Sequence, residues 1–471
     1  MPNPPLERRD MNNEAITETS ISIAVVGHSN TGKTSLLRTL LRDSRFGEVS
    51  ASPGTTRHVE GGSILVAGKP VIDIYDTPGL EDSIGLLEAI DESAPTGERN
   101  RLQAFLEQLP DDSPFDQEAK VIRQLLKDDL VLYVIDIREP VLGKYIDELK
   151  IIAMAAKPVI PVLNFIAEGN TRLASWQQQL ADLGLHAVVR FDTVIFNFED
   201  EKRLYLKIQA MLAAKHDRIQ SLIDDRQRQW HEQVEAARRA IADLLIEVAA
   251  FRFSTSATGI DGGQSMAREK EYFYRTIRKA EQHTVSLLLT LFHFHPDDIK
   301  SEQLPIRDGH WNLDLFDREN LKTFGLSASS YAAKGAALGA GIDVFTGGLS
   351  LGAASALGAL AGFTWSTGKR FRNELANLVT GRHFICADDN TLKILFLRQR
   401  LLYDRLQHRG HAAQQQVDLA SGVAGALPDH WDQWLQQARQ HPEWSALNVG
   451  ENKEPARARE KLVVDITRSL E

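Results

Sequence analysis

Residues 27–34 read Gly27-His28-Ser29-Asn30-Thr31-Gly32-Lys33-Thr34 and directly follow the apolar run Ile21–Val26. The run predicts a buried strand and residues 35–42 predict a helix, so the stretch has the strand–loop–helix setting of a phosphate-binding loop. Glycines let the backbone turn its N–H groups toward a phosphate, and the N-terminus of the helix adds a favourable dipole. We expect the Lys33 ammonium to reach the β- and γ-phosphates from a solvent-facing position, and the Thr34 hydroxyl to bind Mg²⁺.

A second element lies downstream, where residues 70–79 read as a β-branched strand that ends in Asp76-Thr77-Pro78-Gly79. A carboxylate at the carboxyl end of a neighbouring strand can hold the ligand shell of Mg²⁺, and the Gly79 amide can approach a γ-phosphate. Between the two elements, residues 52–58 form a turn-rich segment whose hydroxyl groups are available to sense the metal. The chain therefore carries phosphate, switch and metal groups in this order.

Residues 20–215 resemble the GTPase domains of bacterial proteins of the Era and tRNA-modification (TrmE) type. The resemblance rests on the phosphate-binding loop, on Gly54-Thr55-Thr56-Arg57 and on the Asp-Thr-Pro-Gly of residues 76–79. It implies an α/β P-loop GTPase domain with a doubly wound, mostly parallel sheet, in which Thr34 and Thr56 bind Mg²⁺ and Asp76 reaches the metal through water. The catalytic candidates are Lys33, Thr56 and Gly79. The nucleotide-binding candidates are Gly27, His28, Ser29, Asn30, Thr31, Gly32, Lys33, Thr34, Ser35, Asp76, Gly79 and Asn164.

The residue after Gly79 is Leu80, at the position where Ras-like enzymes carry a glutamine that orients the attacking water. An apolar side chain cannot polarise water, so we expect slow intrinsic turnover. Glu81 and Asp82 are nearby candidates for this role, and the alternative is that both are solvated acids of a switch loop.

Asn30 has two interpretations. Related GTPases with asparagine at this position can use K⁺ beside the phosphates, and the ion then supplies positive charge where other enzymes accept an arginine finger. Alternatively, Asn30 only tolerates an unusual loop dihedral.

The base-recognition motif departs from the family pattern. The family expects Asn-Lys-x-Asp after the strand that ends near residue 164, whereas this chain has Asn164-Phe165-Ile166-Ala167. Asn164 is retained, but alanine replaces the aspartate that accepts two guanine N–H bonds, and Glu168 is adjacent. A charge-assisted hydrogen bond contributes about 1.5–3 kcal/mol, so we expect weakened discrimination of guanine from adenine unless Glu168 substitutes.

The chain divides, by this interpretation, into a disordered tail at 1–18, a GTPase domain at 19–215 with an insertion at about 81–129, and an all-α domain at 216–471. A helix is expected at 99–109 in the insertion, which is placed to report the nucleotide state or is a passive loop. Strand signals end near residue 217, and apolar residues then recur at three- or four-residue steps up to 248, as in a long amphipathic helix. Further helices are expected at 268–291, 367–380, 391–409 and 430–441, with Trp431, Trp434 and Trp444 as packing anchors.

A Gly/Ala-rich segment spans residues 331–368, and residues 344–368 carry no charge. Glycines recur at four-residue spacing, as in closely packed membrane helices, but the few large apolar residues make independent spanning marginal. Three interpretations stay open: a buried helical hairpin, a reversible membrane insert and a self-association zipper.

The composition indicates which class of partner is disfavoured and which cellular location is favoured. The net charge of −10 and the absence of a long Lys/Arg run disfavour nucleic acid as the main partner. Cys386 is the only cysteine, which favours a reducing, cytoplasmic location, with peripheral contact to the inner membrane left open.

The arrangement also resembles a bacterial family whose C-terminal domain has no assigned function. Our leading hypothesis is a Mg²⁺-dependent switch that binds and hydrolyses GTP and uses its helical half as effector, with K⁺ as an optional ion. The alternative is an interaction or membrane-scaffold protein that binds nucleotide with little hydrolysis.

Overall fold

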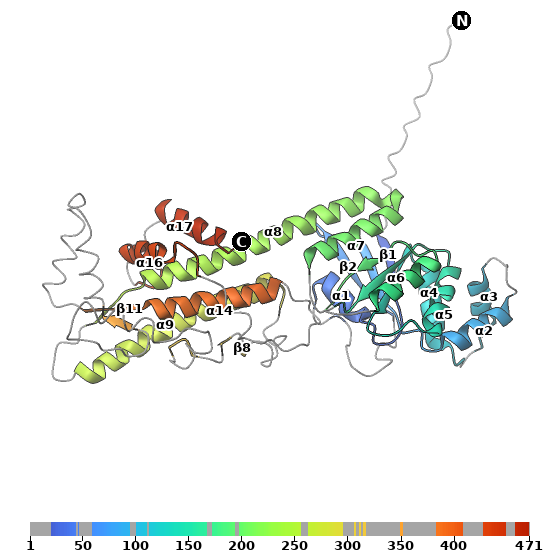
Figure 1. Cartoon of the computed structure of the whole chain (residues 1–471), viewed down its shortest axis with the longest axis horizontal. Coiled ribbons are helices and arrows are strands. Elements are labelled where there is room, and N and C mark those ends of the chain that lie inside the picture. The colour runs from blue at the N-terminus through green and yellow to red at the C-terminus, as the bar shows by residue number, and fades with distance from the viewer. Residues whose placement is uncertain are drawn as a thin grey trace, which may run out of the picture. The chain divides into compact units, whose positions relative to one another are not determined.

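The computed structural model describes residues 20–43, 46, 59–94, 100–110, 113–166, 172–193, 197–255, 262–294, 306–307, 310–311, 314–316, 349–351, 383–407, 427–448 and 457–470. The chain forms two units, shown in Figure 1. The first comprises residues 1–41, 45–191 and 199–225, and the second comprises residues 42–44, 192–198 and 226–471. The predicted tail at 1–18 lies outside the described residues.

The first unit is built on a six-stranded sheet in the order β2-β3-β1-β4-β5-β6. Its strands are β1 (Ile21–Val26), β2 (Glu60–Val66), β3 (Lys69–Asp76), β4 (Leu130–Asp136), β5 (Val159–Asn164) and β6 (Val189–Arg190). All neighbouring pairs are parallel except β2 and β3, which are antiparallel. The expected doubly wound, mostly parallel sheet is therefore confirmed.

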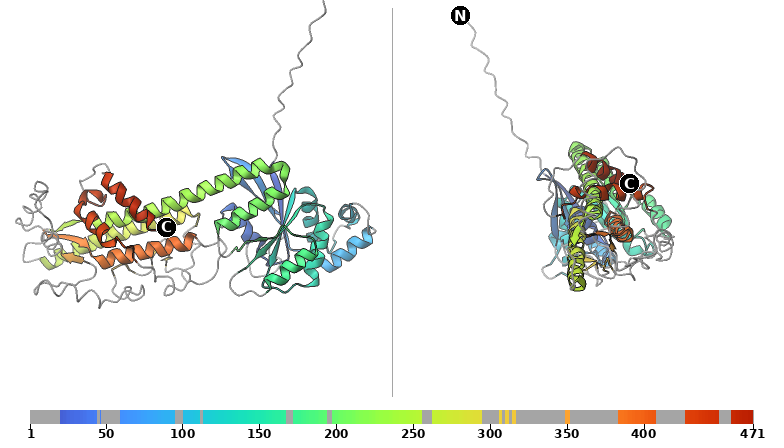
Figure 2. Two further views of the ribbon diagram at one scale, coloured as in Figure 1. Left: turned by 45° about the horizontal axis from the view of Figure 1, so that its top comes forward. Right: turned by 90° about the vertical axis from the view of Figure 1, so that its left-hand side faces the viewer.

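Both faces of this sheet are buried. Along β1, Ile21, Ile23 and Val25 belong to one core cluster, and Ala24 and Val26 belong to the other. This alternation follows from the two-residue period of a strand, and a near-continuous apolar run is typical of a sheet covered by helices on both sides. Figure 2 shows the strands with helices around them. Helices outside the predicted insertion include α1 (Lys33–Leu41), α5 (Gly143–Met154), α6 (Leu173–Asp182) and α7 (Phe198–Met211).

The segment predicted as an insertion contributes helices to the core. It contains α2 (Ser83–Ser93), α3 (Arg101–Gln108) and α4 (Asp116–Lys127), and α3 matches the helix expected at 99–109. Apolar side chains from all three helices join the same core cluster as β4. The described part of this segment is therefore packed structure that begins directly after the loop following β3.

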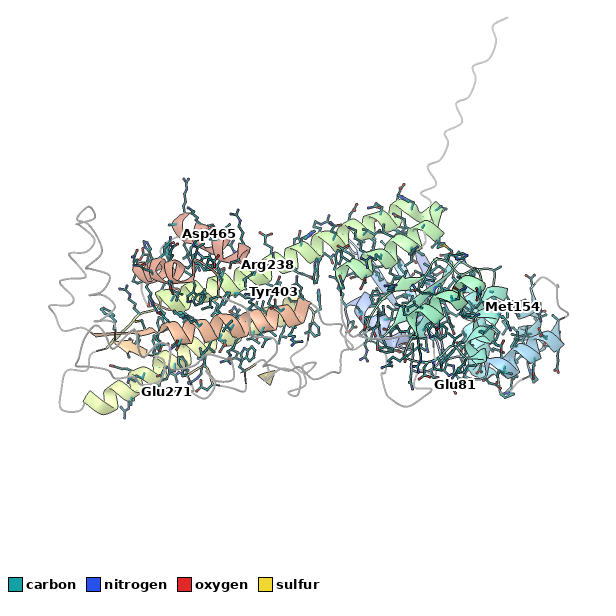
Figure 3. All side chains as sticks on the ribbon, viewed as in Figure 1. Glu81, Met154, Arg238, Glu271, Tyr403 and Asp465 are labelled. Carbon is teal, nitrogen blue, oxygen red and sulfur yellow. The ribbon has the colours of Figure 1, made fainter. Side chains whose placement is uncertain are left out.

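The second unit is mainly helical. Its helices are α8 (His216–Ala250), which begins in the first unit, α9 (Gly262–Leu291), α14 (Asp389–Gln407), α16 (Trp431–Gln440) and α17 (Arg457–Arg468). The sequence did not predict α17, whereas the long helix after residue 217 is confirmed. Apolar faces from all five helices share one core, which also buries Trp431, Trp434 and Trp444. Polar contacts add to it: Arg238 Nε of α8 donates a hydrogen bond to Tyr403 Oη of α14 over 2.9 Å (Figure 3).

This unit also contains strands that the sequence analysis missed. β7 (Phe253–Thr255), β10 (Leu349–Leu351) and β11 (His383–Ala387) form an antiparallel sheet in the order β10-β11-β7, and β8 (Ile306–Arg307) pairs with β9 (His310–Trp311). The expectation of no strands after residue 217 was therefore wrong. Strands of two to five residues carry too little periodicity to be recognised, and the partners β7 and β11 lie far apart along the chain.

The Gly/Ala-rich segment is described only at Leu349–Leu351, which is a strand where a helix was expected. The rest of residues 331–368, and the helix expected at 367–380, lie outside the described residues. Of the helices that the structure describes, none combines the length and apolarity needed to cross a bilayer.

Candidate nucleotide site

The loop between β1 and α1 approaches the neighbouring strands closely. Gly32 has a φ of +94°, and a Cβ there would lie 2.3 Å from Nδ2 of Asn164, so only glycine fits. Asn30 has a φ of +64°, a left-handed conformation that asparagine tolerates better than most residues. The dihedral interpretation of Asn30 therefore has a structural basis, and the K⁺ interpretation stays a prediction.

Lys33 is buried, with only 7% of its surface exposed. Its Nζ donates hydrogen bonds to the carbonyl oxygens of Gly27 over 3.0 Å and of His28 over 2.9 Å. Burial lowers the pKa of the ammonium, while the charges of Asp76, Glu148 and Glu81 act in the opposite direction. The expected solvent-facing lysine was wrong, because the loop curls around the ammonium and turns its own carbonyl groups toward it.

Thr34 and Asp76 come together from α1 and the end of β3. The Thr34 hydroxyl donates a hydrogen bond of 2.5 Å to Oδ2 of Asp76. Asp76 is 1% exposed, and its other oxygen, Oδ1, is buried without a hydrogen-bond partner. Burial raises the pKa of this carboxyl group, and the Thr34 hydrogen bond and the Lys33 charge oppose that rise. An unpaired carboxylate oxygen beside a hydroxyl fits the oxygen ligands and bound water that Mg²⁺ prefers. Thr56 lies outside the described residues.

The loop after β3 lies against the phosphate-binding loop. A Cβ on Gly79 would lie 2.9 Å from the backbone nitrogen of Ser29, so glycine is required for this approach. The Ser29 hydroxyl donates a hydrogen bond of 2.9 Å to Oε1 of Glu81, which Figure 3 labels. Asp82 instead caps α2 by accepting the backbone N–H of Gly85 over 2.9 Å. Of the two acids proposed to orient water, Glu81 is therefore the one held at the phosphate-binding loop.

Asn164 connects β5 to the same loop. It is fully buried; its Nδ2 donates to the Thr31 carbonyl oxygen over 2.9 Å and its Oδ1 accepts the Phe165 N–H over 2.8 Å. The guanidinium of Arg138 lies 3.8 Å above the Phe165 ring and also pairs with the carboxylate of Asp136. Ala167 and Glu168 lie outside the described residues.

The side chain of His28 contacts groups that the sequence analysis did not select. Its ring lies within hydrogen-bond distance of the Leu80 carbonyl oxygen, of Glu148 and of Lys144. Two features of the sequence could have indicated this cluster. Tyr133, whose hydroxyl donates to Glu148, is the one large polar side chain inside the aliphatic run of β4. Lys144 and Glu148 share a helix face at four-residue spacing.

Comparisons with known proteins assign both parts of the chain. Residues 177–468, more than half of the chain, match the family model described as "Domain of unknown function (DUF3482)". The chain belongs to the DUF3482 family. In this DUF3482 protein, residues 22–165 also match the model described as "50S ribosome-binding GTPase". The expected P-loop GTPase domain, and its fusion to a helical domain of unassigned function, are therefore confirmed.

Each of the curated relatives matches part of the chain. The tRNA modification GTPase MnmE of Synechococcus elongatus is 38% identical over 76 residues, which are 16% of each chain. The GTPase Era of Rickettsia akari is 24% identical over 211 residues, covering 40% of this chain and 71% of Era. The chain spans about a sixth of the length of the first curated relatives.

Among solved structures, Era of Aquifex aeolicus bound to GDP and AlF₄⁻ is 22% identical to the DUF3482 protein with a TM-score of 0.27, covering 36% of this chain and 50% of that one. Another Era structure, in complex with MgGDPNP and part of 16S ribosomal RNA, has the same identity and TM-score and covers 37% and 51%.

Proposed function

We propose that the first unit binds GTP with Mg²⁺ and hydrolyses it, and that the helical second unit is the effector of this switch. The observation that carries the proposal is the pair formed by Thr34 and Asp76 beside the phosphate-binding loop, with one buried carboxylate oxygen left unpaired. Membership of the GTPase family supports the same activity.

The residues of the site take the following roles in this proposal. Lys33 and the backbone N–H groups of the loop bind the phosphates, and the Gly79 amide meets the γ-phosphate. Thr34, Thr56 and Asp76 would hold Mg²⁺, which supplies positive charge to the phosphate oxygens when it is bound. The carbonyl groups of Gly27 and His28 already hold the ammonium of buried Lys33 in the loop. Binding of a phosphate should therefore need little rearrangement of this side chain.

We propose slow intrinsic turnover. Leu80 is fully buried and apolar, so it can neither orient nor polarise water. Glu81 is held by Ser29 at the phosphate-binding loop and is the better of the two acid candidates for a role in hydrolysis. We also propose to test whether a K⁺ ion bound by Asn30 supplies further positive charge beside the phosphates.

Recognition of the base is proposed to be weak. Asn164 uses both ends of its amide to join Thr31 to Phe165, which supports a role in shaping the site. Phe165 offers an aromatic ring where the family has lysine, and stacking on a ring does not distinguish guanine from adenine. Ala167 cannot accept the guanine N–H groups, which leaves Glu168 as the alternative acceptor.

We also propose a location for the protein and the classes of partner for its second unit. We propose a cytoplasmic protein whose second unit acts on another protein, on itself or at the inner membrane surface. An Era structure contains 16S ribosomal RNA, and the matching GTPase model is named for 50S ribosome binding. The net charge of −10 argues against RNA as the main partner of this chain. The competing function is a nucleotide-binding scaffold with little hydrolysis.

The test is a time course of GTP cleavage by the purified full chain. It is run in K⁺ and in Na⁺, with and without liposomes, and with and without ribosomes, alongside calorimetry of GTP and GDP. Multiple turnovers that require Mg²⁺ support the switch. Tight GTP binding without cleavage under every condition supports the scaffold, and absence of GTP binding contradicts both. Sedimentation with ribosomes, or flotation with liposomes that depends on the nucleotide, identifies the partner class.

A further inference from the structure

A chain of polar contacts lies between the phosphate-binding loop, the loop after β3 and helix α5. The His28 Nδ1 atom lies 3.0 Å from the Leu80 carbonyl oxygen and 2.8 Å from Oε1 of Glu148. On the other side of the ring, Nε2 lies 2.9 Å from Nζ of Lys144. One side chain of the phosphate-binding loop therefore contacts both other elements.

The partners of His28 indicate which nitrogen of its ring donates a hydrogen bond. A carbonyl and a carboxylate oxygen can only accept, so Nδ1 must carry the hydrogen. A lysine ammonium can only donate, so Nε2 must be the acceptor. These contacts fit the Nδ1–H tautomer, with one donor directed at Leu80 and Glu148 and one acceptor directed at Lys144.

The buried groups around His28 make the loss of its hydrogen bonds costly in free energy. Glu148 is fully buried, and its second oxygen, Oε2, accepts a hydrogen bond of 2.7 Å from the hydroxyl of Tyr133. Burial, together with the charge of Glu148, raises the pKa of Tyr133 well above its usual range, so this hydroxyl keeps its proton. The His28 ring also packs edge-on against the ring of Tyr145, with 5.4 Å between the ring centroids. Removal of His28 leaves a buried carboxylate oxygen without its donor.

The next residue of the loop reinforces the same contact. Ser29 donates to Glu81 over 2.9 Å, and its backbone lies directly against Gly79. Consecutive residues 28 and 29 thus hold consecutive residues 79–81, with Leu80 fully buried between them. A loop held at three successive residues has few positions available to it.

We propose that His28 is a positioning residue for GTP hydrolysis, which fixes the Gly79–Leu80–Glu81 loop against the phosphate-binding loop and α5. The inference rests on the proposed GTPase function, because the amide of Gly79 and the carboxylate of Glu81 are the groups that we place beside the γ-phosphate. His28 acts on them through the Leu80 carbonyl and does not touch the reacting atoms. Its loss should slow the chemical step and leave nucleotide affinity nearly unchanged.

Three variants of the full chain separate the two sides of the ring. His28→Asn places an amide N–H near the position of Nδ1 and keeps the donor to Leu80 and Glu148. His28→Gln places its amide near Nε2 and keeps the Lys144 side only, and His28→Ala removes both. The matched control is Lys150→Ala, on the same helix, where Lys150 makes an exposed pair with Asp147.

The first measurement is steady-state GTP hydrolysis. Loss of a buried hydrogen bond predicts that kcat falls about tenfold in His28→Ala and His28→Gln, with KM changed by less than about twofold. His28→Asn should recover most of the rate, and Lys150→Ala should match the wild type. Equal rates for His28→Ala and the wild type overturn the proposal, and so does a His28→Asn variant as slow as His28→Ala.

The second measurement does not depend on catalysis. Amide hydrogen exchange of the peptide that contains residues 79–82, in the nucleotide-free protein, should be about tenfold faster in His28→Ala and His28→Gln than in the wild type and His28→Asn. If the wild type cleaves no GTP, the proposed function fails, and exchange alone then decides whether His28 positions the loop. If His28→Ala does not fold, the His28→Gln and His28→Asn pair gives the same comparison. Unchanged exchange in His28→Gln overturns the inference.

Discussion

The hydroxyl of Thr34 and the carboxylate of Asp76 share a hydrogen bond of 2.5 Å that joins the first turn of α1 to the last residue of β3. The two residues are 42 positions apart, and the bond leaves the other oxygen of Asp76 buried and unpaired. The proposed metal site can therefore be tested by substituting Thr34.

Thr34→Val removes the hydroxyl and keeps the shape of the side chain. We expect the Mg²⁺ affinity of the GTP complex to fall about 10- to 100-fold, because both a metal ligand and the partner of Asp76 are lost. A Mg²⁺ titration of the complex with a fluorescent GTP analogue measures the change, with EDTA as the metal-free limit. Thr34→Ser is the matched control and should bind Mg²⁺ like the wild type. If Thr34→Val does so too, the metal site lies elsewhere.

Lys33→Ala should abolish GTP binding and also reduce stability. The ammonium provides the phosphate contact and is hydrogen-bonded to the carbonyl oxygens of Gly27 and His28, so its loss should lower the free energy of unfolding by about 1–3 kcal/mol. Calorimetry and chemical denaturation measure the two effects. Undiminished GTP binding by this variant would refute the assignment of the phosphate-binding loop.

Asn30 can be tested by two substitutions that separate its two interpretations. Asn30→Gly keeps access to the left-handed backbone conformation and removes the side-chain oxygen, whereas Asn30→Asp keeps an oxygen ligand. If Asn30 binds K⁺, K⁺ stimulation of GTP cleavage is lost in Asn30→Gly and retained in Asn30→Asp, with nucleotide affinity preserved in both. Equal wild-type rates in K⁺ and Na⁺ leave only the backbone role.

Ala167→Asp restores the family's acid at the base-recognition motif. We expect the preference for GTP over ATP to rise about 10- to 100-fold, in line with the strength of a charge-assisted hydrogen bond. Competition binding of the two nucleotides to wild type and variant measures this ratio. A wild type that already excludes ATP strongly, with no change in the variant, assigns the base contact to Glu168 or another group.

Asp128 predicts a pH-dependent effect on stability. Burial raises the pKa of this carboxyl group to about 6 from its ordinary value of 3.8, although Gln124 donates hydrogen bonds to both of its oxygens. Between these two pH values the folded protein holds a proton that the unfolded chain releases, so ionisation of Asp128 costs stability as the pH rises toward 6.

Asp128→Asn removes this titration. We expect the variant to be more stable than the wild type by about 1–3 kcal/mol at pH 7, and the difference to shrink as the pH falls to about 4. Chemical denaturation at both pH values measures it. The matched control is Asp147→Asn, which makes the same carboxylate-to-amide change at a half-buried aspartate that pairs with Lys150. A wild type as stable as Asp128→Asn at pH 7 contradicts the raised pKa.

Local patterns explain why much of the fold could be predicted. The strand Ile21–Val26, the strand Leu130–Asp136 and the long helix after residue 217 follow from apolar runs and periodicity, which depend on neighbouring residues. The phosphate-binding loop follows equally from its glycines and its setting between a strand and a helix. Local sequence patterns are therefore enough to predict the GTPase domain, its sheet and the helical character of the second unit.

Which groups in that framework are buried, and which are paired, depends on the folded arrangement of distant segments. Lys33 is enclosed by the loop carbonyls, Asp82 caps a helix, and His28 meets Glu148 from 120 positions away. The strand β11 pairs with β7 across more than a hundred residues of chain. Spacing along the sequence does not encode these contacts, because burial and hydrogen bonding depend on which distant segments the folded chain brings together.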